Sequence, residues 1–182
     1  MKKYCQPQAG FCFRYPASWT VLGEIFEGNG VVVAPEQTGD RAQWDGITVA
    51  LVAPADENGE GPSLEAVIEK TATAMREAGQ NFETLQRREL TVDHGPAQML
   101  KTRYRENVTG RDWIEELVFL QDEENDVYSI ALKCAPEHLA HLEPAMQSVL
   151  ASWTALPAPA PAEDAPSASP TPSAPHRLEQ PR

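Results

Sequence analysis

Histidines and a carboxylate that lie close together near the end of the sequence are the first candidates for chemistry. His138 and His141 are three residues apart, and Glu137 stands beside them, so a helix would bring these side chains to one surface. Imidazole is a frequent zinc ligand, but a zinc site needs three or four protein ligands. No third ligand can be assigned from the sequence. His138 and His141 are therefore only candidate metal ligands, without an identified third ligand. We predict no catalytic residue and no cofactor.

Three cysteines could form a disulfide or supply a nucleophile. Cys5 could pair with Cys12, or either could pair with Cys134; the pairing is left open, as is the alternative of three reduced thiols. A disulfide would indicate an oxidising compartment. Cys134 with His138 is the cysteine–histidine pair that is close in sequence, but a thiol at position 134 is also expected to pack among apolar neighbours.

Two tryptophans stand at positions where an aromatic side chain could contact a partner. Trp113 follows a turn, and Trp44 lies in a polar run. Exposed tryptophans often anchor protein interfaces, whereas buried ones cover the rim of a core. We expect Trp44 and Trp113 to be candidate interface residues.

These residues must be positioned by helices and strands that the apolar spacing indicates. A helix is predicted over 63–78, with Ser63 as its N-cap and Gly79 ending it in a left-handed conformation. A second helix is predicted over about 138–153, with a short first turn or a kink because Pro144 interrupts it.

The remaining pattern is that of strands. Ile47 to Val52 is a continuous apolar run, expected to be buried on both faces. A four-stranded meander is predicted from Glu83 to Cys134. If Thr109-Gly110 is a two-residue turn within it, Arg103 lies opposite Glu116.

Composition divides the chain into three parts and argues against nucleic-acid binding and against a transmembrane segment. Of 16 prolines in 182 residues, eight lie between Ala155 and Arg182. We predict an N-terminal extension over 1–10, one globular domain over 11–154 and a disordered Pro/Ala/Ser-rich tail over 155–182. The formal net charge of −12 argues against nucleic acid, and no apolar run is long enough for a transmembrane segment.

The order of elements and two short motifs resemble a known family. The opening Phe13-Arg14-Tyr15-Pro16-Ala17-Ser18-Trp19 and the closing Met146-Gln147-Ser148-Val149-Leu150-Ala151-Ser152-Trp153 are similar to those of PsbP-like domains, which include bacterial lipoproteins and secretion chaperones. The resemblance covers about residues 10–154. It implies an α+β fold, an α/β/α sandwich with a central, largely antiparallel sheet flanked by helices 63–78 and about 138–153. It carries over no active-site residue.

The family implies binding more often than catalysis, and three functions follow as hypotheses. The first is a non-catalytic binding or accessory module of the bacterial cell envelope, with a protein partner. The second is a cytoplasmic chaperone or adaptor for a secreted client, and the third is a hydrolase with an unrecognised site. Met1 to Gly10 lacks the apolar core of a signal peptide, so the extracytoplasmic location assumes a removed leader. The location would be cytoplasmic if Met1 is the true start.

Overall fold

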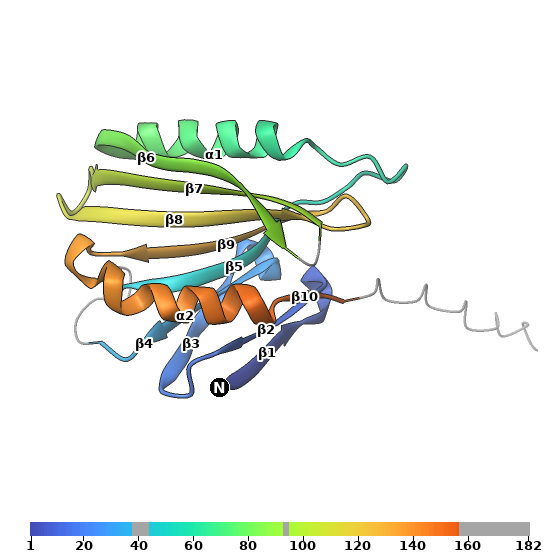
Figure 1. Cartoon of the computed structure of the whole chain (residues 1–182), viewed down its shortest axis with the longest axis horizontal. Coiled ribbons are helices and arrows are strands. Elements are labelled where there is room, and N and C mark those ends of the chain that lie inside the picture. The colour runs from blue at the N-terminus through green and yellow to red at the C-terminus, as the bar shows by residue number, and fades with distance from the viewer. Residues whose placement is uncertain (38–43, 93–94, 157–182) are drawn as a thin grey trace, which may run out of the picture.

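A seven-stranded antiparallel sheet forms the centre of the molecule, in a computed structural model that describes residues 1–37, 44–92 and 95–156. The helix α1 covers one face of this sheet (Figure 1), while α2 and a small three-stranded sheet lie against the other. The helices are α1 (Leu64–Ala78) and α2 (Leu139–Ser152). The strands are β1 (Lys2–Gln6), β2 (Phe11–Tyr15), β3 (Trp19–Ile25), β4 (Gly30–Pro35), β5 (Gly46–Ala53), β6 (Gly79–Val92), β7 (Gly95–Glu106), β8 (Asp112–Gln121), β9 (Val127–Cys134) and β10 (Thr154–Ala155).

The strand order explains how the two faces are filled. The large sheet runs β3-β4-β5-β9-β8-β7-β6, and the small sheet runs β1-β2-β10. Successive side chains of a strand point to opposite faces. Met99 and Val118 therefore pack in the core under α2, while Leu100 and Leu117 pack under α1. The predicted α/β/α sandwich with a largely antiparallel sheet is confirmed.

The first helix forms as its sequence predicts, except at its end. The Ser63 hydroxyl accepts the Ala66 N–H at 3.2 Å, which stabilises a helix by about 1 kcal/mol. Ile68 is fully buried at the centre of the apolar stripe. Gly79 was expected to be left-handed, but its φ of −132° is extended because the chain passes directly from α1 into β6.

The second helix contains the proline that the sequence analysis expected to interrupt it. A short 3₁₀ turn (Pro136–His138) comes first, and α2 then continues through Pro144. Leu142, Met146 and Val149 are buried, so the predicted apolar face is the one that packs.

Two local expectations about strands differ from the structure. Arg103 lies opposite Ile114, and Lys101 faces Glu116 at 3.1 Å, because the β7–β8 connection is longer than two residues. Val52 was expected to be buried but is 38% exposed, because it borders an open pocket between the end of β5 and α1.

The N-terminal residues also differ from their expectation. Residues 1–10 were expected to be an extension outside the domain, yet Lys2–Gln6 forms β1 and pairs along the whole of β2. Its side chains are mostly exposed, so the apolar alternation that marks a strand is absent there. Residues 157–182 of the predicted tail lie outside the described residues. Among those described, no helix is both long and apolar enough to span a membrane.

Candidate functional site

The histidine candidate at position 138 is held by a buried carboxylate. Asp45 precedes β5 and is 5% exposed. Its Oδ2 lies 2.6 Å from His138 Nδ1, and its Oδ1 accepts the Ala135 N–H at 2.8 Å. Arg111 Nη2 lies 3.3 Å from the same Oδ1. Asp45 thus joins the start of β5 to the β9–α2 connection and the β7–β8 loop.

His141 is not brought to this carboxylate as a second metal ligand. It is exposed on α2, and one ring nitrogen of His138 is already engaged by Asp45. Within residues 1–37, 44–92 and 95–156, no group of three or more histidine, cysteine or acidic side chains is arranged to hold a metal ion. The Asp45–Arg111 ion pair and the Asp45–His138 contact serve to link three segments of the chain.

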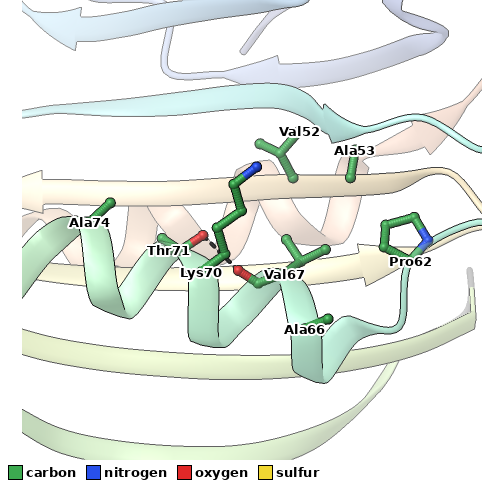
Figure 2. Close-up of a pocket in the computed structure, with 8 residues that line it drawn as sticks. All are labelled: Val52, Ala53, Pro62, Ala66, Val67, Lys70, Thr71 and Ala74. Atoms are coloured by element: carbon green, nitrogen blue, oxygen red, sulfur yellow. Dashed lines mark hydrogen bonds between the residues drawn. The ribbon is translucent and has the colours of Figure 1, made fainter.

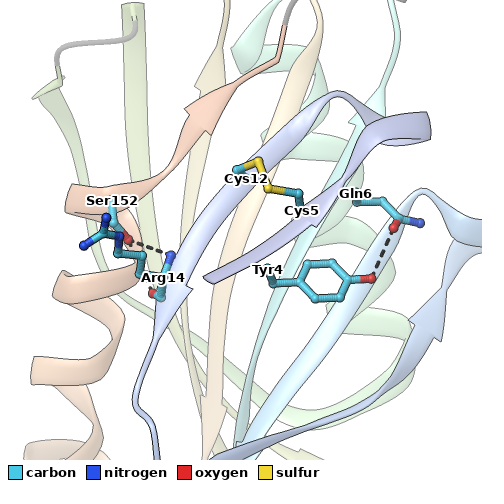
Figure 3. The surroundings of a disulfide bond; sticks show 6 residues. All are labelled: Tyr4, Cys5, Gln6, Cys12, Arg14 and Ser152. Carbon is cyan, nitrogen blue, oxygen red and sulfur yellow. Dashed lines mark hydrogen bonds between the residues drawn. A yellow bond between two sulfur atoms is a disulfide. The ribbon is translucent and has the colours of Figure 1, made fainter. Parts of the chain in front are cut away.

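The three cysteines separate into a disulfide and one buried thiol. Cys5 and Cys12 are bridged between β1 and β2, opposite one another in the strand register (Figure 3). Cys134 is free and buried. Burial, with the nearby Asp45 charge, raises the pKa of the Cys134 thiol to about 12. A thiol with so high a pKa is a poor nucleophile at neutral pH, so the pair with His138 lacks the thiolate that covalent chemistry requires.

The two tryptophans have different environments. Trp113 is fully buried, and two cations lie over its ring, the Arg111 guanidinium at 4.1 Å and the Lys133 ammonium at 4.5 Å from the ring centroid. The expectation that Trp113 contacts a partner is therefore not met, because the following residues of β8 carry it into the core under α1. Trp44 is half-buried and lines a pocket.

The pocket beside Trp44, here called the β3 pocket, lies at one end of the strand order. It encloses about 380 Å³. Its lining comes from four residues of β3, one each of β4, β5 and β9, and the residue before Asp45: Leu22, Gly23, Glu24, Ile25, Val32, Thr48, Lys133 and Trp44. Val32 and Thr48 are direct partners in the sheet, which brings two distant segments into one floor. Of the residues that line this pocket, Trp44 was predicted as a candidate from the sequence and the others were not, since nothing local in the sequence reveals the pairing of β4 with β5.

Two charged side chains line the β3 pocket, Glu24 of β3 and Lys133 of β9, and Lys133 has carboxylate neighbours behind it. Lys133 Nζ lies 3.3 Å from Glu106 Oε1. A hydrogen bond from the Thr109 hydroxyl, and next the Lys133 charge, lower the pKa of Glu106. Burial raises the pKa of the neighbouring Glu115, whose Oε1 accepts the Tyr104 hydroxyl at 2.8 Å. Lys133, Glu106, Glu115 and Tyr104 thus serve one another as partners, and the pocket offers mainly apolar contact beside the Glu24 carboxylate.

A second pocket, here called the α1 pocket, lies where α1 meets the end of β5 (Figure 2). It encloses about 360 Å³. Small aliphatic side chains supply most of its wall, together with one cation: Val52, Ala53, Ala66, Val67, Ala74 and Lys70. The sequence offered no signal for it beyond the alanines on the flank of the helix.

Comparison with solved structures defines the class of fold. No family model matches the sequence, and no curated protein is significantly similar to it. Solved structures are similar at low identity: the chain has the PsbP-like fold.

Three such structures illustrate the range of this fold. Cyanobacterial PsbP (CyanoP) from Synechocystis is 15% identical, with a TM-score of 0.55 over 85% of this chain and 91% of that one. The Ran-binding protein Mog1p of Saccharomyces cerevisiae is 11% identical, with a TM-score of 0.53 over 85% and 95%. LpqN of Mycobacterium tuberculosis, involved in cell envelope biogenesis, is 16% identical, with a TM-score of 0.51 over 81% and 83%. None of these three descriptions names a catalytic activity.

Proposed function

We propose that the chain is a non-catalytic binding module of the bacterial cell envelope and that it binds an extended segment of a partner protein along β3. The observation that carries this proposal is the position of β3. It is the end strand of the large sheet, and the β3 pocket opens beside it. Within the described residues, no strand pairs with the outer side of β3.

The chemistry of this edge favours a polypeptide as the occupant. An edge strand presents backbone N–H and C=O groups that an added strand can pair with, while alternate side chains of the added strand enter neighbouring pockets. Leu22 and Ile25 line the β3 pocket, and Val21 is 37% exposed. A small apolar ligand would use the pocket and leave the backbone groups unused, whereas an extended peptide uses both.

The candidate catalytic side chains have structural contacts or an unsuitable pKa, which supports a non-catalytic role. Asp45 and His138 join three segments of the chain, and the buried Cys134 thiol has a raised pKa. Catalytic acids and bases need an approach for substrate and a pKa near the working pH. Mog1p, described as Ran-binding, shares this fold, which adds support for a protein partner.

The Cys5–Cys12 disulfide supports a location outside the cytoplasm, since such bonds persist in oxidising compartments. LpqN, with its role in the cell envelope, supports the same location. The second candidate, a cytoplasmic chaperone or adaptor for a secreted client, would use the same surface with reduced cysteines. Quenching intact host cells in acid and then alkylating under denaturing, non-reducing conditions separates the two. One alkylated thiol per chain is expected, and three would indicate a cytoplasmic protein with reduced cysteines.

Capture of partners by the full chain tests the binding surface. Leu22→Asp places a charge in the β3 pocket, and Leu85→Asp makes the same change on β6, the strand at the opposite end of the sheet, where Leu85 is 43% exposed. We expect one partner to be retained by the unmodified chain and by Leu85→Asp, and to be lost from Leu22→Asp. Retention by Leu22→Asp, or no partner at all for the unmodified chain, would contradict the proposal.

A further inference from the structure

The α1 pocket combines an aliphatic wall with one cation placed over it. Ala66, Lys70 and Ala74 follow one another at intervals of four along α1, so they lie on one face of the helix. The Lys70 side chain extends from the helix across the pocket toward β5, where Val52 and Ala53 lie (Figure 2). Most of a ligand in this space would contact methyl and methylene groups.

The Lys70 ammonium is available to a ligand. Among the described residues, no carboxylate lies within ion-pair distance of it, although the chain carries a net charge of −12. The acids nearest to it along the helix, Glu65 and Glu69, both bind Arg87 of β6. The Thr71 hydroxyl is also engaged, donating to the Val67 carbonyl at 2.9 Å. Lys70 is thus the polar group of the wall that can take a charged ligand.

We propose that the α1 pocket binds an aliphatic carboxylate, with its alkyl chain between α1 and the end of β5 and its carboxylate on the Lys70 ammonium. A volume of about 360 Å³ falls within the range of small-molecule sites, about 300–1,000 Å³. The lining holds no aromatic ring, which favours an alkyl chain over a planar ligand. One ammonium balances one negative charge, which favours a carboxylate over a phosphate dianion. This site is separate from the β3 pocket, so the inference does not depend on the proposed function.

A chain-length series measured by calorimetry tests the alkyl part. The probes are hexanoate, octanoate and decanoate, each below its micelle concentration, added to the full chain. Burial of each added methylene should lower Kd about fourfold until the chain outgrows the pocket. Octylamine, which carries the opposite charge on a comparable chain, should bind more weakly than octanoate.

Two pairs of variants test where the ligand lies. Lys70→Gln should weaken octanoate binding about fivefold, as expected for a solvent-accessible ion pair, whereas Lys3→Gln on β1 should not change it. Ala74→Leu fills part of the pocket from an exposed position and should weaken binding further. Thr73→Leu, an exposed neighbour on α1 that does not line the pocket, is its control.

Three outcomes would overturn the proposal. They are no saturable binding of any carboxylate in the series, equal binding of octylamine and octanoate, and binding that is insensitive to both Lys70→Gln and Ala74→Leu. Leu22→Asp should leave carboxylate binding unchanged, so failure here and failure of the β3 surface are distinguishable.

Discussion

At the scale of single residues, Asp45 decides what the nearby polar groups can do. The histidine spacing at 138 and 141 suggested a metal site. In the structure, His138 Nδ1 is hydrogen-bonded to Asp45, which lies 93 residues away in sequence. The same carboxylate accepts a buried backbone N–H from Ala135, and a buried donor left without an acceptor costs about 1–3 kcal/mol. No local motif predicts such a contact. The spacing of the histidines was visible in the sequence, whereas the group that engages one of them was not.

Replacing Trp113 tests whether this side chain belongs to the core or to an interface, since a core residue affects stability and an interface residue affects partner binding. Because the ring is fully buried and in contact with two cations, Trp113→Ala should lower the free energy of unfolding by about 3–5 kcal/mol. Chemical denaturation measures this, with Val108→Ala, at a 92% exposed loop position, as the control. Unchanged stability together with loss of partner binding would contradict burial and would show that Trp113 is an interface residue.

Glu115 makes stability depend on pH. Burial raises the pKa of this carboxyl in the folded state above its ordinary value near 4.5. The folded state therefore holds the proton where the unfolded state has lost it, and the free energy of unfolding falls as pH rises through that window. Glu115→Gln cannot titrate and keeps an acceptor for the Tyr104 hydroxyl.

The melting temperature of Glu115→Gln relative to the unmodified protein should therefore be higher at about pH 7 than at about pH 4. Glu57→Gln, in the exposed loop before α1, should show no such difference between the two conditions. A gap for Glu115→Gln that closes as pH rises would mean that this carboxylate is stabilised by Lys133 more than it is penalised by burial.

At the scale of elements, the passage from α1 into β6 shows where sequence patterns fail. Ser63 and the apolar stripe predicted the helix correctly because both are local signals. The role of Gly79 was wrong, because a glycine after a helix usually indicates a left-handed cap. Here the reason for glycine is a close approach: a Cβ at position 79 would lie 2.5 Å from Tyr104 Cδ2 of β7.

Gly79→Ala should accordingly destabilise the fold through this clash. The backbone is extended at this residue, so conformational strain does not contribute, and overpacking of this kind costs about 1–3 kcal/mol. Thermal unfolding is the measurement, and Ala78→Ser at the exposed preceding residue is the control. A variant as stable as the unmodified protein would show that Tyr104 moves aside without cost.

The strand β1 depends on a few contacts, of which the disulfide is one. Cys5 lies opposite Cys12, and Gln6 Nε2 donates to the Gly28 carbonyl at 2.6 Å. Closing so short a loop stabilises a protein by about 2 kcal/mol. The double variant Cys5→Ala/Cys12→Ala should lose about that amount.

Hydrogen exchange of the β1 amides should accelerate in that double variant more than exchange in β8. Cys134→Ala, which removes the free thiol instead, should leave exchange in β1 unchanged. Uniform acceleration across the molecule would indicate that the disulfide stabilises the whole fold and not β1 in particular.

At the scale of the whole molecule, the sequence was sufficient for the architecture and insufficient for the pockets. Helical stripes and alternating strands are local patterns, and their order led to the α/β/α sandwich. The linings of the β3 and α1 pockets come from segments that are distant in sequence, such as Leu22, Thr48 and Lys133 in one and Val52 and Lys70 in the other. Such combinations depend on strand order and register, which short motifs do not determine.

The surface proposed to bind a partner protein is the edge of β3. The most direct measurement is photocrosslinking in intact host cells, with a photoreactive phenylalanine analogue replacing Val21 in one form of the full chain and Leu85 in another. These positions are similarly exposed, at 37% and 43%, on the two end strands of the same sheet. A discrete adduct with another protein is expected from position 21 and none from position 85. An adduct from position 85 alone, or equal adducts from both, would contradict the proposal.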